Sequence, residues 1–220
     1  MSYILNIETS TTNCSVSLSI ENDLVDCIEQ DSLNYSHSEN LHVFIKELLN
    51  KNNTKFNHLS AISVSRGPGS YTGLRIGLSA AKGLCYGLDI PLISISSLKI
   101  LANSIKYDGF IVSTMDARRD EVYSCIYDSN LNIIREEKPE IINHESFIDI
   151  SKNNKLLFIG DGQFKCKELI NTNDNFSFES SILRPTSRNM IDLAFDKLKN
   201  SDFEDLAYFE PKYLKEFRTN

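Results

Sequence analysis

The sequence predicts an α/β protein of two lobes, in which mixed sheets are flanked by helices. Segments that suit strands open both halves of the chain, at residues 3–29 and 110–135. Segments with helical periodicity follow in each half and alternate with further short apolar runs. Strands first, and then strands alternating with helices, indicate sheets that are partly antiparallel, partly parallel and covered by helices.

The first half of the chain carries three strand patterns and then two long helical patterns. Residues 14–20 (C-S-V-S-L-S-I) alternate with period two, which is typical of a half-buried strand in a meander of three. A helix is predicted over residues 36–49, where Ser36 and Glu39 have the spacing of a capping box. A glycine turn and a second long helix, residues 70–87, follow.

The second half repeats this kind of order, so we place a boundary near residue 104. The expected lobes are residues 1–104 and residues 105–220. In the second lobe we expect strands at 110–115, 122–127, 131–135 and 156–159, helices at 164–170 and 187–199, and a polar loop at 171–181.

Composition excludes several classes of protein. The chain has 220 residues, a net charge of −7 and five scattered cysteines. No window approaches the ~20 apolar residues of a membrane span, and no C-x-x-C pair suggests zinc or a disulfide framework. We expect a cytoplasmic protein with reduced thiols and no membrane contact. Because the sequence has no basic stripe, we expect another component to hold the RNA if this protein acts on RNA.

The first candidate site is the segment I-L-N-I-E-T-S-T-T, residues 4–12. A carboxylate at a strand end, Glu8, followed by the hydroxyls of Thr9 and Ser10, suits a phosphate cradle that holds magnesium. The alternative is an ordinary turn between two strands, which this motif alone favours.

The second candidate is R-G-P-G-S-Y-T-G-L-R-I-G, residues 66–77. Gly67 and Gly69 permit a left-handed backbone and close approach, and the amides from Ser70 onward could face an anion. The segment lacks the Gly-Lys-Ser/Thr triplet of a Walker loop and the spacing of a dinucleotide loop. Standard phosphate motifs therefore do not explain it.

The helix behind this turn is apolar on nearly every side. Gly73, Gly77 and Ala81 are spaced by four, which leaves one face without bulk. The only polar stripe consists of Arg75, Ser79, Lys82 and Tyr86. Such a helix is either buried centrally in its own lobe or packed on both its lobe and a second protein.

Other polar groups give no catalytic arrangement. Arg118 and Arg119 lie between acidic residues, where they suit either phosphate or RNA binding or a solvated turn with local ion pairs. The spacing of His37 and His42 puts their side chains about 140° apart on a helix, so they do not converge on a metal. No nucleophile elbow is present, which leaves a proteolytic role without support.

These motifs, in their order along the chain, resemble the TsaB (YeaZ) family of the actin-like, sugar-kinase-like (ASKHA) superfamily. The resemblance rests on residues 4–12 and 66–84, with support from M-D-A-R-R-D-E-V-Y at 115–123, G-D-G at 160–162 and P-K-Y-L at 211–214. It implies a non-catalytic subunit of the bacterial complex that forms threonylcarbamoyladenosine beside the tRNA anticodon. The partners it implies are a TsaD-like transferase and a TsaE-like ATPase, with tRNA bound only through the complex.

The resemblance also implies where partners bind. The family's docking surface lies on the helices that here cover residues 36–49 and 70–87, so the expected partner-binding residues are Leu41, Ile45, Gly73, Leu74, Gly77, Leu78 and Ala81. The same surface is expected to form a twofold homodimer when the chain is alone. Residues expected to face a phosphate or nucleotide are Glu8, Thr9, Ser10, Gly67, Gly69, Ser70 and Arg118.

Departures from the catalytic relatives support the non-catalytic assignment. The TsaD-like metal pair H-x-x-x-H corresponds here to Ser97 and Leu101, which are unsuited to a transition metal. No cofactor is therefore expected to be required, although ATP or ADP with magnesium could be shared weakly at an interface. The alternative is an ATP-dependent small-molecule kinase or carbamoyltransferase of the same superfamily.

Overall fold

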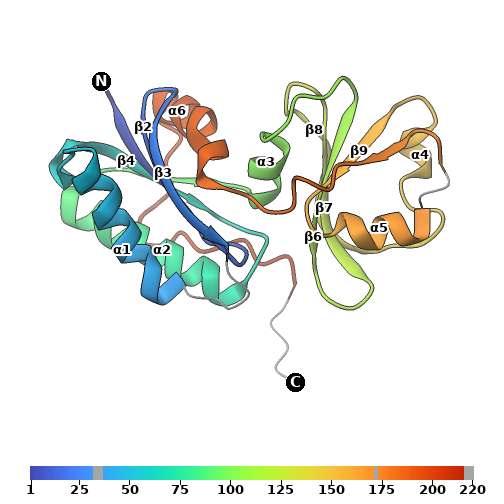
Figure 1. Ribbon diagram of the computed structural model, residues 1–220, viewed down its shortest axis with the longest axis horizontal. Coiled ribbons are helices and arrows are strands. Elements are labelled where there is room, and N and C mark those ends of the chain that lie inside the picture. Colours follow the sequence, from blue (N-terminus) through green and yellow to red (C-terminus); the bar gives the residue numbers. More distant parts are fainter. Residues whose placement is uncertain (32–36, 171–172, 216–220) are drawn as a thin grey trace. The chain divides into compact units, whose positions relative to one another are not determined.

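The computed structural model describes residues 1–31, 37–170 and 173–215 and divides into two compact units (Figure 1). Unit 1 comprises Met1–Ile100 and Pro185–Tyr213, and unit 2 comprises Leu101–Arg184 and the residues after Tyr213. Each unit contains one five-stranded mixed sheet flanked by helices. This confirms the predicted fold class.

Unit 1 is built on a sheet with the strand order β3-β2-β1-β4-β5. The predicted meander is present, because β1, β2 and β3 pair antiparallel, and β4 and β5 extend the sheet parallel to β1. The strands are β1 (Tyr3–Glu8), β2 (Asn13–Ile20), β3 (Asp23–Asp31), β4 (Leu59–Ser65) and β5 (Leu92–Ile95). The helices are α1 (His37–Lys51), η1 (Phe56–His58), α2 (Tyr71–Leu88), α3 (Ser97–Ala102), η2 (Ser187–Met190) and α6 (Ile191–Lys199).

The two faces of this sheet differ in chemistry. Helices α1 and α2 lie side by side on one face, over a core that includes Leu5, Ile7 and Val16 (Figure 1). The opposite face carries buried polar side chains beside a smaller apolar cluster, and η2 and α6 cover it. The expected half-buried strand is therefore wrong for β2, because Ser15 and Ser17 are 0% exposed. The period-two alternation of β2 indicates that its two faces differ in chemistry. It does not show that either face contacts solvent.

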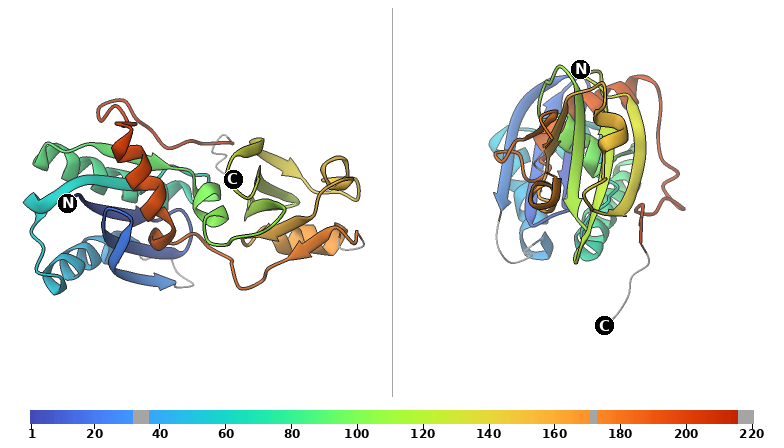
Figure 2. Two further views of the ribbon diagram at one scale, coloured as in Figure 1. Left: turned by 90° about the horizontal axis from the view of Figure 1, so that it is seen from above. Right: turned by 90° about the vertical axis from the view of Figure 1, so that its right-hand side faces the viewer.

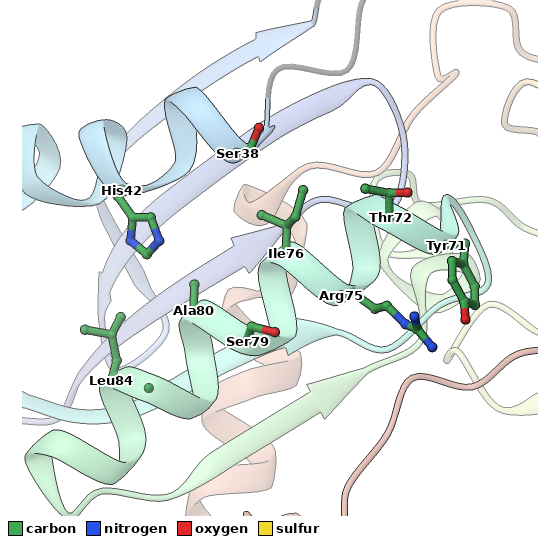
Figure 3. Close-up of a pocket in the computed structure, with 10 residues that line it drawn as sticks. Ser38, His42, Tyr71, Thr72, Arg75, Ile76, Ser79, Ala80 and Leu84 are labelled. Carbon is green, nitrogen blue, oxygen red and sulfur yellow. The ribbon is translucent and has the colours of Figure 1, made fainter.

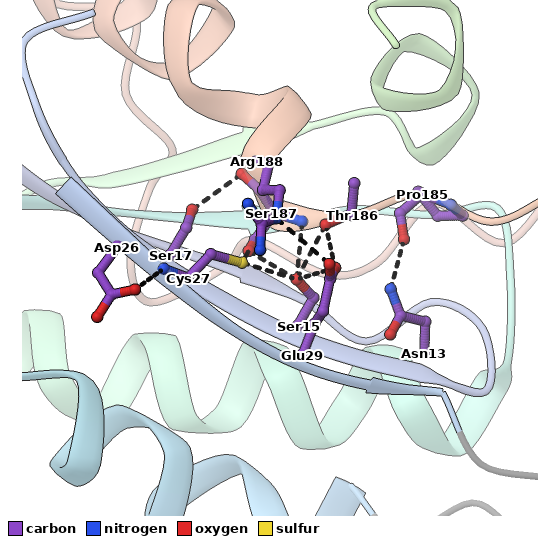
Figure 4. Close-up of polar contacts among 10 residues, drawn as sticks. All are labelled: Asn13, Ser15, Ser17, Asp26, Cys27, Glu29, Pro185, Thr186, Ser187 and Arg188. Atoms are coloured by element: carbon purple, nitrogen blue, oxygen red, sulfur yellow. Dashed lines mark hydrogen bonds and ion pairs between the residues drawn. The ribbon is translucent and has the colours of Figure 1, made fainter. Parts of the chain in front are cut away.

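A polar clamp holds the returning chain on this second face (Figure 4). The hydroxyls of Ser15 and Ser187 are 2.8 Å apart. Thr186 donates to Glu29 at 2.5 Å, and the Arg188 Nε lies 3.3 Å from the same carboxylate. Because η2 covers polar side chains here, hydrogen bonds hold it on the sheet, whereas apolar packing holds α1 and α2 on the other face.

Ser187→Ala is expected to lower the free energy of unfolding by about 1 kcal/mol, because it removes the bond to Ser15 from a buried network. The comparison is Ser79→Ala, at an exposed helical position, which should change stability by less than about 0.5 kcal/mol. Urea denaturation measures both. Equal effects from the two substitutions would show that the clamp adds nothing.

Unit 2 repeats the strand arrangement, with the order β10-β9-β6-β7-β8. Its core includes Phe147 and Phe158, whose rings meet edge to face at 5.1 Å. Its elements are β6 (Phe110–Asp116), β7 (Glu121–Tyr127), β8 (Ile133–Ile141), α4 (Ile148–Ser151), β9 (Leu156–Ile159), α5 (Gln163–Ile170) and β10 (Phe176–Phe178). The expected loop at 171–181 is thus wrong where β10 lies, and α4 was not predicted.

The division of the chain also differs from the single boundary expected near residue 104. The chain leaves unit 1 within α3 and returns at Pro185, so residues 185–213 are not part of unit 2. The reason is packing: Met190 and Ala194 join Ile4, Ala61 and Ile93 of the first sheet in one buried cluster. A helix pattern reveals an apolar stripe but not the sheet that the stripe will cover. The expected cap Ser36 lies outside the described residues.

Candidate functional site

The site begins where two turns of unit 1 meet, the turn after β1 and the glycine turn before α2. The Ser70 amide donates to the Ser10 carbonyl at 2.7 Å. The Thr9 hydroxyl donates to the Gly73 carbonyl at 2.9 Å. The structure therefore brings together six of the residues expected to face a phosphate, namely Glu8, Thr9, Ser10, Gly67, Gly69 and Ser70.

These groups bind one another across the junction. Gly69 lies against Ser10 so closely that a Cβ would collide with the Ser10 backbone, and Gly67 adopts a left-handed backbone at φ +100°. The Ser70 hydroxyl caps α2 by accepting from the Gly73 amide at 3.2 Å. Two of the amides that could have faced an anion are thus already bonded within the protein.

Glu8 is the unusual titratable group of this junction. Its side chain is 0% exposed. One oxygen, Oε1, accepts from the Ser10 amide at 2.5 Å, and Oε2 has no hydrogen-bond partner among the described residues. Burial raises the pKa of Glu8 from 4.5 to about 7, and the nearby Ser10 and Ser65 groups offset this only in part. At pH 7 the carboxyl is therefore protonated in about half of the molecules.

The stripe of small residues on α2 faces inward. A Cβ at Gly73 would collide with the Thr9 carbonyl, and one at Gly77 with the Thr9 hydroxyl. The helix therefore lies directly on the turn after β1, and no second protein is needed to explain the glycines. The glycine stripe is buried within its own unit, whereas the opposite side of α2, which includes Thr72, Arg75 and Ser79, is exposed, so the helix is not buried centrally.

The expected partner-binding residues need correction for the same reason. All seven are buried inside unit 1, namely Leu41, Ile45, Gly73, Leu74, Gly77, Leu78 and Ala81. The five side chains and the two glycines lie between the helices and the sheet, so they present almost no surface. A partner on these helices would meet the opposite sides of α1 and α2.

That outer side carries a groove of about 710 Å³ between the two helices (Figure 3). His42 projects from α1 toward α2, and Ile76, Ala80 and Leu84 project from α2 toward α1. Arg75 lies at one end of the row. Other lining residues are Ser38, Tyr71, Thr72, Ser79 and Gly83. Sequence reasoning missed these positions, although the polar stripe containing Arg75 and Ser79 marked the correct side.

In unit 2, Arg118 and Arg119 are exposed on the turn between β6 and β7. Both have left-handed backbones, with φ of 67° and 52°. The Asp116 carboxylate stabilises this turn. It accepts hydrogen bonds from the Arg118 amide at 2.5 Å and from the Lys165 ammonium at 2.8 Å. Of the two alternatives given for Arg118 and Arg119, these contacts agree with a solvated turn that has local ion pairs.

The positions that correspond to a TsaD-like metal pair are internal. Ser97 and Leu101 are both 0% exposed. Within residues 1–31, 37–170 and 173–215, no three His, Cys, Asp or Glu side chains gather as metal ligands would. In the same described part, no helix has the length and apolarity to span a membrane.

Comparisons place the chain among known proteins. The family model described as "TsaD: tRNA N6-adenosine threonylcarbamoyltransferase" matches residues 32–219. The "tRNA threonylcarbamoyladenosine biosynthesis protein TsaB" of Escherichia coli K12 is 29% identical over 96% of this chain and 94% of its own length. The protein of the same name from Bacillus subtilis 168 is 38% identical over 62% of this chain and 60% of its own length.

The fold is that of a solved relative. The structure titled "YeaZ from Pseudomonas aeruginosa" superposes with a TM-score of 0.83 at 24% identity, covering 97% of this chain and all of that one. The two units, each with one mixed sheet flanked by helices, agree with the fold class that the resemblance implied. With the model match over residues 32–219, the chain belongs to the family of tRNA N6-adenosine threonylcarbamoyltransferase TsaD and, within it, to the TsaB (YeaZ) proteins.

Proposed function

We propose that this chain acts in tRNA threonylcarbamoyladenosine biosynthesis as a non-catalytic subunit that docks onto a TsaD-like transferase. The names of its relatives support the pathway. The observation that carries the docking role is the groove between α1 and α2, which is lined largely by apolar groups and lies on the outer side of both helices.

The family match supports a partner that is related to this chain. The family model that the chain matches is described by the name of the transferase, so the partner is expected to carry the same pair of helices. Two related surfaces can pack about an approximate twofold axis. In this proposal a TsaE-like ATPase joins the pair in the cytoplasm, and tRNA contacts the assembled complex. The free chain uses the same groove to form a homodimer.

Reconstitution tests the proposal. The TsaD-like subunit and the TsaE-like ATPase of the same organism are combined with tRNA and the threonylcarbamoyl adenylate donor, with and without this chain. Modified adenosine is expected only when the chain is present. Full activity without the chain would overturn the proposal.

Gly83→Arg is expected to weaken binding of the TsaD-like subunit at least about tenfold, because a long charged side chain would then fill the groove. The matched control is Gly87→Arg on the same helix, outside the groove lining. Neither glycine has a heavy atom within 4 Å of an added Cβ, so both variants should fold. Isothermal titration calorimetry measures the affinities. Equal binding by the two variants would exclude the groove.

The second candidate function is an ATP-dependent small-molecule kinase or carbamoyltransferase. Its support is that the turns after β1 and before α2 meet at Glu8 and Ser70. The bonded amides and the buried carboxyl argue against it. Calorimetry with Mg-ATP on the isolated chain separates the two functions. Micromolar binding with turnover would favour the enzyme, whereas millimolar or absent binding would leave at most a nucleotide shared with the partner.

A further inference from the structure

The C-terminal segment of unit 1, residues 204–213, forms a strap along α2 (Figure 2, dark red). The Glu204 amide donates to the Leu92 carbonyl at 2.9 Å, and the Lys212 amide donates to the Arg66 carbonyl at 2.8 Å. Between these points Lys82 of α2 donates to the Ala207 carbonyl at 3.3 Å. The strap is thus hydrogen-bonded to the rest of unit 1 at both of its ends and in its middle.

The strap ends beside Arg75 and fixes its side chain. The Arg75 Nε donates to the Tyr213 hydroxyl at 3.0 Å. The guanidinium carbon lies 3.9 Å from the centre of the Tyr71 ring and 5.8 Å from that of Tyr213. The two rings are themselves 5.0 Å apart. An exposed arginine normally samples many rotamers, but this one is held by a ring face and a hydrogen bond.

The hydrogen bond to Tyr213 and, more weakly, the charge of Glu210 on the strap raise the pKa of Arg75. No Asp or Glu side chain in the described part of the chain forms an ion pair with it. Arg75 is among the residues that line the groove, and its side chain projects from α2 toward Tyr71, whereas Ile76 and Ala80 point toward α1 (Figure 3). A fixed cation beside an apolar groove is complementary to an apolar helix surface that carries one carboxylate.

We propose that Arg75, held by Tyr71 and Tyr213, is the specificity-determining residue of the groove and receives a carboxylate of the docked TsaD-like subunit. This inference rests on the proposed function. The planar guanidinium pairs with a carboxylate through two parallel hydrogen bonds, and Nη groups remain for it while Nε bonds Tyr213. Because the side chain is already ordered, docking loses little rotamer entropy. Tyr213 is a positioning residue, since it acts through Arg75.

The test measures affinity for the TsaD-like subunit by calorimetry at low and high salt. Arg75→Gln is expected to weaken binding roughly 10- to 100-fold and to reduce its salt dependence. Arg75→Lys should restore part of the loss. Lys46→Gln, an equal charge change at an exposed position of α1 outside the groove lining, should change affinity less than about threefold.

Tyr213→Phe tests the positioning role. It removes the hydroxyl that binds Nε and is expected to weaken docking about three- to tenfold. In the double variant with Arg75→Gln, it should add nothing further, because both changes act on one contact. Independent, additive losses would overturn the positioning role.

The outcomes separate this inference from the proposed function. Absence of binding by the unmodified chain would overturn the proposed function. Binding by the unmodified chain, together with equal affinities for Arg75→Gln and Lys46→Gln, would overturn the role of Arg75 alone. If thermal melting shows that Arg75→Gln is unfolded, the Arg75→Lys and Tyr213→Phe variants decide. Unchanged affinity in both would then reject the role.

Discussion

Gly73→Ala is expected to lower the free energy of unfolding by about 3 kcal/mol, whereas Gly83→Ala on the same helix should raise it by roughly 0.5–1 kcal/mol. The added Cβ at position 73 would collide with the backbone carbonyl of Thr9, which cannot rotate away as a flexible side chain would. At position 83 the same methyl group enters open space and stabilises the helix by reducing backbone freedom in the unfolded chain.

Chemical denaturation of the two alanine variants measures this difference, and the opposite signs provide an internal control. Equal effects would show that α2 does not rest on the turn after β1. The result also governs how docking is tested. A larger residue at Gly73 or Gly77 would disrupt unit 1 itself, so lost binding in such a variant would say nothing about the partner surface. Substitutions at the outer positions Gly83 and Gly87 avoid this ambiguity.

Glu8→Gln is expected to stabilise the protein by about 3 kcal/mol at pH 8 relative to its effect at pH 4. The pKa of Glu8 is about 7 in the folded protein and 4.5 ordinarily, with burial as the main cause. Between these values the folded state holds a proton that the unfolded state has released. Stability from this group is therefore complete below pH 4.5 and is lost as pH rises toward 7.

Glutamine keeps the shape of the protonated acid but cannot ionise, so the variant should lose this part of the pH dependence. Denaturation curves at several pH values from 4 to 8 measure it, with Glu47→Gln on the exposed side of α1 as the control. If the pH dependence of Glu8→Gln matches that of the unmodified chain, then the pKa of Glu8 in the folded protein lies close to its ordinary value of 4.5. An undetected counter-charge would then have to face Oε2.

Local patterns were sufficient for most of the elements and for the fold class. Period-two alternation located β2, and the glycine turn before a long apolar pattern located α2. Both signals depend on neighbours a few residues away, which is why they can be read along the chain. The strand β10, only three residues long, gave no such signal and was read as loop.

The candidate site was recognised in part. The motif at Glu8 and the motif at Gly67 were each identified, and the structure joins them at the Ser10–Ser70 bond. The side of α2 that faces outward was misassigned, because its small residues suit close approach by any neighbour. The neighbour proved to be Thr9, which is 64 residues before Gly73, and periodicity carries no information about such a contact.

The sequence by itself determined most of the strands and helices, the family and the two motifs that meet in unit 1. Only the tertiary structure decided which sheet residues 185–213 would cover, and thus where the units divide. It also decided that Ser15 and Ser17 are buried under η2 and that α2 turns Arg75 outward and its glycines inward. The physical reason is the same in each case. Burial depends on which distant surfaces fit together, and that fit is a property of the folded chain.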